Sequence, residues 1–364
     1  MLGPVTSRGI DPILRDVSRS IYLTLRVAPA ATRRQLGIAY LFCRTADTIA
    51  DTRLLAPEAR LRCLRSFRAQ FEGAAPDPEA VAAISREAGA PQRIPAEAEL
   101  LRRLAECFEL HASLREADRL LIRRLVTTLT RGMEMDLSIF PPEESGAVRA
   151  LESDADLDLY TYYVAGCVGE FWTDLQASHL RALASWDLPK RREQGVRFGK
   201  GLQMTNVLRD VDADLAIGRC YFPRPRLDAA GVTVEALRAG APRRRLRPIL
   251  EDLVQLTLGH YRAGWEYTLA IPRRLPRLRL ACAWPLLLGL RTLELLCRSE
   301  DPYAPGARVK VPRGEVYAIL RRSAAKVLSN AGLARMYDEL ERGVGDARLG
   351  VRSLLPLASG ARPR

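Results

Sequence analysis

Residues 203–223 read QMTNVLRDVDADLAIGRCYFP and carry more structural information than any other stretch of the chain. The segment is largely apolar, yet it places Asn206, Asp210 and Asp214 at intervals of four residues. Side chains four residues apart share one face of a helix. We therefore expect a helix that points a row of oxygen-bearing side chains into the interior. Asp212 falls off this row and is expected to be a bystander.

A second pair of carboxylates lies in residues 40–51, YLFCRTADTIAD, where Asp47 and Asp51 are again four apart. Like charges at this spacing repel by roughly 0.2–0.5 kcal/mol. Inside a protein they need cations or protonation to persist. Carboxylate and amide oxygens are ligands that suit Mg²⁺. Two such rows could hold several ions around a diphosphate and neutralise it as a leaving group. The alternative is an ordinary pair of solvated surface residues.

Basic side chains flank both pairs. Arg44 precedes Asp47 by three residues, Arg209 adjoins the second row, and Arg219 follows it in a GRCYFP turn. A guanidinium group can donate two parallel hydrogen bonds to a phosphate. In a chain this rich in arginine, any single neighbour can also be a coincidence.

Helical periodicity runs through almost the whole chain, and no run of strict alternation indicates a strand. Stretches rich in Pro and Gly predict loops at 218–242 and 301–314, and a loop with at most one short helix at 73–95. The periodic pattern predicts helices over residues 12–30, 31–52, 57–72, 96–110, 114–138, 157–185, 190–215, 244–270, 277–299 and 313–343.

Composition narrows the functional classes. The 364 residues include 56 basic and 43 acidic side chains, a net charge of +13 that attracts polyanions such as nucleic acid, anionic membranes or phosphorylated substrates. Seven cysteines without a CxxC pair favour a reducing cytoplasm over a disulfide scaffold or zinc site. We find no P-loop, GxSxG or strand-linked GxGxxG. The apolar segment 278–297 is interrupted by charges, so it predicts a buried helix.

These segments resemble the squalene/phytoene synthase family, and most closely its bacterial squalene synthases. Residues 40–51 and 203–223 are similar to its two aspartate motifs, LYTYYVAGCVG (159–169) to the segment between them, and DVSRSIYLTLR (16–26) to its N-terminal substrate-binding segment. The matches keep the family's order and span about residues 15–300.

The resemblance implies an all-α, single-domain isoprenoid synthase bundle with a central active-site cavity across residues 1–364. Short tails are expected at about 1–10 and 352–364.

The resemblance also implies roles for individual residues. The metal ligands, for Mg²⁺ or Mn²⁺, would be Asp47, Asp51, Asn206, Asp210 and Asp214. The residues that contact the diphosphate or line its pocket would be Ser18, Arg19, Ser20, Tyr40, Arg44, Gln203 and Arg219. Tyr160 would assist ionisation or proton removal, with Val164 and Val168 continuing its helix face beside a prenyl chain.

The implied activity is condensation of two farnesyl diphosphates through presqualene diphosphate to squalene, with reduction by NADPH. Alternatives within the family are a phytoene or dehydrosqualene synthase, which needs no reduction, or a presqualene diphosphate synthase. Ala50 stands where many squalene synthases have Glu, which weakens the assignment of one product. A terpene cyclase is a related alternative, and a non-catalytic helical protein that binds polyanions is one from another class.

The expected partners are prenyl diphosphates and, peripherally, an anionic membrane. We expect no nucleic acid, and a cytoplasmic monomer or weak dimer.

Overall fold

We describe a computed structural model of the chain. The described residues are Leu14, Leu25, 27–52, 55–239, 243–304 and 306–354, with side chains described as far as residue 348. The predicted helix at 12–30 lies mostly outside these ranges. So do Ser18, Arg19 and Ser20, and the predicted tail at 1–10.

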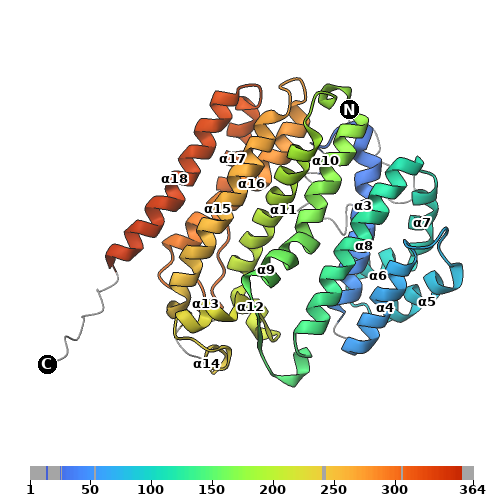
Figure 1. Cartoon of the computed structure of the whole chain (residues 1–364), viewed down its shortest axis with the longest axis horizontal. Helices are drawn as coiled ribbons and strands as arrows, with labels where there is room; N and C mark the ends of the chain where they lie inside the picture. Colours follow the sequence, from blue (N-terminus) through green and yellow to red (C-terminus); the bar gives the residue numbers. More distant parts are fainter. Residues whose placement is uncertain are drawn as a thin grey trace.

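Helices form almost all of the described structure (Figure 1). The α-helices are α3 (Ala30–Asp51), α4 (Pro57–Ala69), α5 (Pro78–Gly89), α6 (Pro95–Arg102), α7 (Leu104–Ala112), α8 (Glu116–Ile139), α9 (Asp154–Thr161), α10 (Cys167–His179), α11 (Leu188–Arg209), α12 (Val211–Ala216), α13 (Arg224–Ala229), α14 (Val234–Arg238), α15 (Arg247–Ala270), α16 (Pro276–Arg298), α17 (Arg313–Lys326) and α18 (Asn330–Leu354). Shorter helical turns are η1 (Glu143–Ser145), η2 (Tyr162–Gly166), η3 (Arg181–Leu183) and η4 (Arg243–Leu246). The predicted all-α class is confirmed.

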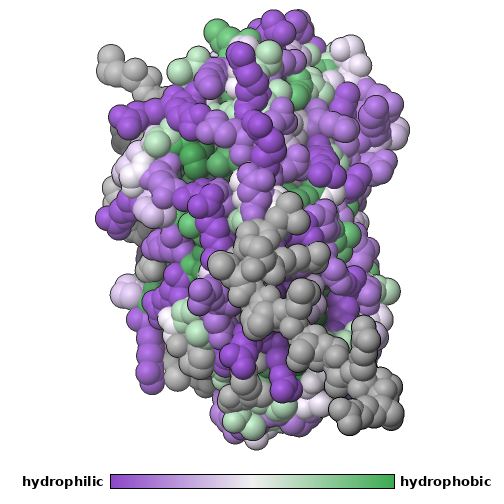
Figure 2. Space-filling view, turned by 90° about the vertical axis from the view of Figure 1, so that its left-hand side faces the viewer, coloured by the Kyte–Doolittle hydropathy of each residue, from purple (hydrophilic) through white to green (hydrophobic). Residues whose placement is uncertain are grey.

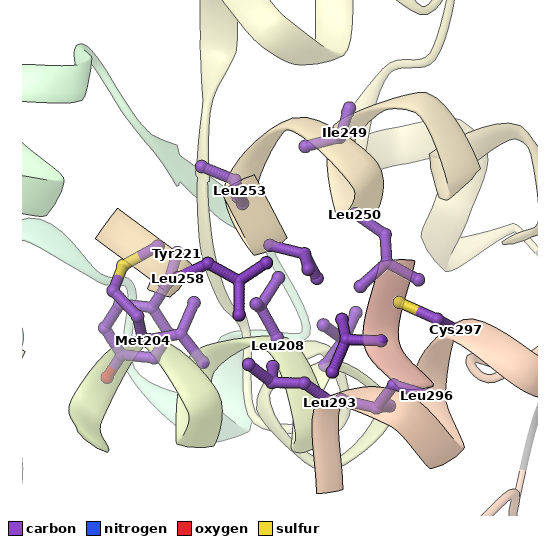
Figure 3. Close-up of a cluster of buried hydrophobic side chains, with 14 of the residues drawn as sticks. Met204, Leu208, Tyr221, Ile249, Leu250, Leu253, Leu258, Leu293, Leu296 and Cys297 are labelled. Atoms are coloured by element: carbon purple, nitrogen blue, oxygen red, sulfur yellow. The ribbon is translucent and has the colours of Figure 1, made fainter. Parts of the chain in front are cut away.

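The long helices lie side by side across the molecule in the order α18, α16, α15, α11, α10, α8 and α3, with α4 to α7 beyond α3 (Figure 1). Two main apolar clusters fill the space between them. One lies under the α3 side. The other lies under α11, α15 and α16, where Met204, Leu208, Leu250 and Leu293 interdigitate (Figure 3). The two aspartate motifs therefore belong to different halves of the core.

Glycine residues allow α11 to approach η2 and α10 closely. A Cβ atom added at Gly199 would lie 2.1 Å from the Ala165 carbonyl oxygen, and one at Gly169 would lie 1.8 Å from the Gly195 oxygen. Real Cβ atoms do not come that close, so larger residues would force α10 and α11 apart. This contact fixes the segment that carries Tyr160 against the helix that carries the second aspartate motif.

Several predicted helices are divided in the structure. Residues 96–110 form α6 and α7, and residues 313–343 form α17 and α18. The second division has a clear cause. Arg279, fully buried, donates hydrogen bonds to the Val327 oxygen at 2.9 Å and to Asn330 Oδ1 at 2.6 Å, so it fixes the turn between these helices. The last helix continues to Leu354, so residues 352–354 are helical rather than part of the predicted tail.

The predicted loops had different outcomes. Residues 73–95 contain one helix, α5, of twelve residues, for which the prediction had allowed. The prediction of a loop at 218–242 was wrong. Residues 218–242 contain strand β2 (Arg219–Pro223), α13 and α14. β2 pairs in parallel with β1 (Arg149–Leu151), with Arg149 opposite Arg219. Such pairing depends on residues seventy positions apart, so a local pattern could not predict it.

The apolar helix α16 has the length and composition of a membrane-spanning segment, with a mean hydropathy of 1.5. However, 61% of its most apolar window is buried inside the fold. It packs against α15, α17 and α18. The expectation of a buried core helix at 277–299 is therefore confirmed.

Candidate active site

The first aspartate motif lies on the last turns of α3. Arg44 Nη1 lies 3.6 Å from Asp47 Oδ2, and another Arg44 nitrogen contacts Glu97. Burial, and after it the Asp51 carboxylate, raises the pKa of Asp47 to about 7. Nevertheless, 48% of the Asp47 side-chain surface meets solvent. This carboxylate is surrounded by protein atoms but keeps contact with solvent, so a small ion can reach it.

The second motif is not one continuous helix, so the prediction of a single helix at 190–215 was wrong. α11 ends at Arg209, Asp210 adopts φ −99° and ψ 14°, and α12 begins at the next residue. The backbone amide of Asp214 still donates to the backbone carbonyl oxygen of Asp210 at 2.9 Å, so the bend is shallow. Both Asp210 oxygens are contacted by Arg209, with Nε to Oδ1 at 2.8 Å. Burial, followed by the Asp210 charge, raises the pKa of Asp214 to about 7.

Arg219 and Asp136 lie between the two motifs. Arg219 Nη1 is 3.3 Å from Asp136 Oδ2. The Arg219 charge lowers the pKa of both Asp51 and Asp214, although burial raises each more strongly. Burial raises the pKa of Asp136 to about 7, against the lowering effect of Arg219. One arginine therefore acts on a carboxylate from each motif.

Tyr160 lies beside this centre, 6% exposed. Its ring stacks on Tyr221 with centroids 4.6 Å apart, and its hydroxyl oxygen is 3.4 Å from Gln203 Nε2. Gln203 Oε1 in turn accepts a hydrogen bond from Asn206 Nδ2 at 3.2 Å. Thus three residues expected in the site, Tyr160, Gln203 and Asn206, form one hydrogen-bonded chain.

The segment after Tyr160 departs from α-helical geometry. Tyr162–Gly166 forms a π-helical turn, which places one more residue in the turn than an α-helix does. Val164 packs against the core, whereas Val168 is 38% exposed. The prediction that Val164 and Val168 continue one α-helical face was therefore wrong, because the π turn rotates the later residue. Their contact with a prenyl chain stays a prediction. π turns inserted in α-helices occur often at functional sites.

Other predicted residues have mixed placements. Tyr40 is half-buried on α3, and burial raises its pKa to about 12. Asp212, expected to be a bystander, contacts Arg243 and accepts a hydrogen bond from the Gly306 amide at 3.0 Å. It therefore fixes a turn.

Sequence reasoning missed the acidic partners of the arginines. Asp136, Glu97 and Glu143 all contact Arg44 or Arg219, and none belongs to an aspartate pair. The sequence offers one weak indication that Asp136 is functional, because it is the single carboxylate in the mainly apolar segment MDLSIF of residues 135–140.

The carboxylates fit a divalent cation by their chemistry. Raised pKa values at Asp47 and Asp214 mean that their negative charge is disfavoured until a cation arrives. Among the residues that the structure describes, no three Asp, Glu, His or Cys side chains could hold one ion together. A pair in each motif suits Mg²⁺, which takes one or two protein carboxylates and completes its shell with water and substrate phosphates. The metal role of Asp47, Asp51, Asn206, Asp210 and Asp214 stays a prediction.

Comparisons with known proteins agree with the fold and the motifs. Residues 14–315 match the family model described as squalene/phytoene synthase. The chain is 30% identical to a presqualene diphosphate synthase of Rhodopseudomonas palustris, over 84% of this chain and 92% of the relative. It is 37% identical to a phytoene synthase of Thermus thermophilus, over 33% and 38%.

Among solved structures, the complex of TcSQS with the ligand BPH1237 superposes with a TM-score of 0.66, at 25% identity, over 94% of this chain and 97% of the other. The family match and the relatives indicate an enzyme of the prenyltransferase type. The chain belongs to the squalene/phytoene synthase family.

Proposed function

We propose that this protein joins two farnesyl diphosphates head to head and releases presqualene diphosphate. The observation that carries the proposal is that the charge of Arg219 acts on one carboxylate of each aspartate pair, Asp51 and Asp214, because a departing diphosphate needs positive charge beside anionic ligands for metal. The chain is 30% identical to a presqualene diphosphate synthase over 84% of its length, against 28% over 68% for a bifunctional lycopene cyclase/phytoene synthase of Colletotrichum graminicola. This difference favours presqualene diphosphate over phytoene as the product. Reduction to squalene by NADPH stays a prediction.

Binding of the diphosphate would use the arginines. Arg219 and Arg44 are held by carboxylates of this chain, and each can turn part of its fork toward phosphate oxygens. Bound Mg²⁺ would neutralise the leaving diphosphate and so assist ionisation of the allylic carbon–oxygen bond. The protein's own task is to orient the second double bond toward the resulting cation and to keep water away from it.

Tyr160 suits a position beside the cation. Its ring is buried against Tyr221, so two stacked faces lie next to the acidic centre. An aromatic face stabilises a nearby cation by about 0.5–2 kcal/mol. Its hydroxyl remains available for hydrogen bonding, which leaves a role in proton removal open to it.

The test is a product assay on the purified protein. Farnesyl diphosphate with Mg²⁺ should give presqualene diphosphate with or without NADPH. Squalene that appears only with NADPH would overturn the proposed product in favour of a squalene synthase. Phytoene made from geranylgeranyl diphosphate would indicate a longer substrate, and a cyclic monomeric terpene would indicate a cyclase.

We also propose peripheral contact with an anionic bilayer, because the product carries two long apolar chains and the protein has a net charge of +13. Each well-placed Lys or Arg adds about 1 kcal/mol at such a surface. The face beside α18 is mainly hydrophilic, with small apolar areas (Figure 2). Binding to anionic liposomes should therefore weaken as salt rises. Salt-insensitive binding would indicate insertion of an apolar patch instead.

A further inference from the structure

We propose that Asp136, acting through Tyr221, receives the proton that leaves the substrate by way of Tyr160. The proposal rests on the proposed condensation and adds the route of its proton. Neither Asp136 nor Tyr221 belongs to the aspartate pairs, yet both lie against the residue expected to act on the cation. The relay consists of Tyr160, Tyr221 and Asp136.

Hydrogen-bond directions support this route. Tyr221 OH lies 2.7 Å from Asp136 Oδ2, and an ionised carboxylate can only accept, so Tyr221 donates to Asp136. The Tyr160 ring stacks on the Tyr221 ring with centroids 4.6 Å apart, which brings the two phenols together. Since the Tyr221 hydrogen is used by Asp136, the Tyr221 oxygen is left to accept a proton from Tyr160.

At the Tyr160 end of the relay, the hydrogen bonds have the same direction. Gln203 Nε2 points at the Tyr160 oxygen at 3.4 Å, and Gln203 Oε1 accepts from Asn206. The donors therefore run in the same sense at both ends of the relay, from Asn206 through Gln203 to Tyr160 and from Tyr221 to Asp136. A proton that arrives at the Tyr160 oxygen can move along the same line without any side chain reversing its hydrogen bond first.

The surroundings keep water away from the relay. Tyr160 and Tyr221 are 6% and 7% exposed. Tyr221 lies at one end of the apolar cluster, on the same side as Met204 (Figure 3). Buried phenol groups exchange protons through their hydrogen-bond partners. Asp136, which accepts from Tyr221, is therefore the proton acceptor at the end of the relay.

Charges around Asp136 suit an acceptor that changes state. Arg219 and Tyr221 face it from β2, Tyr160 from α9, and the carboxylates of Asp51 and Asp214 act on it from α3 and α12. Burial and the neighbouring carboxylates raise the pKa of Asp136 to about 7, against the lowering effect of Arg219, which lies 3.3 Å away. Both the ionised and the protonated form of Asp136 are therefore accessible near neutral pH.

A carbon–hydrogen bond of the cationic condensation intermediate breaks, and its electron pair forms the new cyclopropane carbon–carbon bond. The proton goes to the Tyr160 oxygen, the Tyr160 proton goes to Tyr221, and the Tyr221 proton goes to Asp136. The cation and one carboxylate are replaced by a neutral ring and one carboxylic acid. No oxidant or reductant is needed.

The test compares two variants with wild type in farnesyl diphosphate and Mg²⁺. Asp136→Asn keeps an acceptor for Tyr221 but cannot take the proton, and Tyr221→Phe removes the link. Both should lower kcat for the cyclopropyl product by about 100-fold, the scale of general-base catalysis, while KM stays within about threefold. Diphosphate release should continue, so allylic alcohols formed by water capture should replace the cyclopropyl product.

Tyr303→Phe is the matched control. Tyr303 is buried beside Phe222, its hydroxyl has no hydrogen-bond partner, and it lies outside the relay. It should leave the product ratio unchanged. Melting temperatures of all variants verify folding, and either Asp136→Asn or Tyr221→Phe suffices if the other does not fold.

Each outcome decides the question. An unchanged product ratio in a folded variant would refute the relay, and so would an equal fall in all products or a large rise in KM, because these indicate a structural or binding role. If wild-type protein forms no condensation product, the proposed function fails and the relay fails with it. If wild type is active and both variants match it, only the relay fails.

Discussion

The two aspartate motifs share a spacing but differ in their backbone and in their basic partners. Asp47 and Asp51 lie on one unbroken helix, α3, whereas Asp210 lies at the junction of α11 and α12. Arg44 divides its contacts between Asp47 and Glu97, while Arg209 contacts both oxygens of Asp210. The first pair is therefore open to a cation. At the second pair, a cation would have to replace Arg209 as the partner of the Asp210 carboxylate.

This difference shows that equal sequence spacing does not give equal sites. What unites the motifs is Arg219, whose charge acts on Asp51 and on Asp214. An account based on the pairs alone would treat them as two independent metal sites. Because the charge of Arg219 acts on a carboxylate of each pair, we expect the two pairs to form one site.

Removal of metal should have the largest effect, because neither motif has enough positive charge of its own to replace a divalent cation. EDTA should abolish product formation, and added Mg²⁺ or Mn²⁺ should restore it, as measured by product analysis. Full turnover in chelated buffer would break the comparison, since the carboxylates would then have another purpose.

Replacement of the paired aspartates should come next. Asp47→Ala, Asp51→Ala, Asp210→Ala and Asp214→Ala should each lower kcat by about 100-fold or more, the scale of electrostatic catalysis. Folding should survive, because each change removes a repelling charge. Asp212→Ala is the control and should be mild. Near-normal turnover in both variants of one motif would show that the site is one-sided.

Tyr160 variants should sharpen the assignment between ring and hydroxyl. Tyr160→Phe keeps the ring, and Tyr160→Ala removes it. If proton transfer dominates, both should lose a similar fraction of kcat, which is the result we expect. Retention of most activity by Phe alone would indicate that the ring stabilises the cation. Wild-type rates in both, at equal melting temperature, would make Tyr160 a packing residue.

Stability against pH should show the smallest effect. Asp47 and Asp214 have a pKa of 3.8 as a reference value, against about 7 in the fold. Between these values the folded state binds more protons than the unfolded state, so stability falls as pH rises. The melting temperature of metal-free protein should therefore drop from about pH 5 to about pH 8. The drop should be shallower in an Asp47→Asn, Asp214→Asn double variant, and an identical slope would contradict the raised pKa values.

Sequence alone could predict the helical class and both aspartate pairs because each depends on residues within one or two turns. Even the arginine neighbours were visible for this reason. The break at Asp210 was not, because no Gly or Pro marks it and the chain bends by a modest change of backbone angles. Likewise, the π turn at Tyr162–Gly166 depends on close packing against α11.

Asp136 could not be predicted because its role depends on tertiary contacts. It lies on α8, 83 residues before Arg219 and 85 before Tyr221, both of which lie on β2. The β1–β2 pairing that presents Arg219 is equally remote in sequence. A local sequence pattern can predict ligands that repeat every four residues on a helix. Residues that connect two such motifs, such as Asp136 and Arg219, can be recognised only from the tertiary structure.

The central claim is that both aspartate pairs bind one diphosphate from opposite sides. A crystal structure with Mn²⁺ and a non-ionisable thio analogue of farnesyl diphosphate tests it directly, because the anomalous signal of Mn²⁺ locates each ion. The account predicts ions at Asp47 and Asp51 and at Asp210 and Asp214, all bound to one diphosphate beside Arg219. Ions at one motif only, or a diphosphate distant from Arg219, would contradict it.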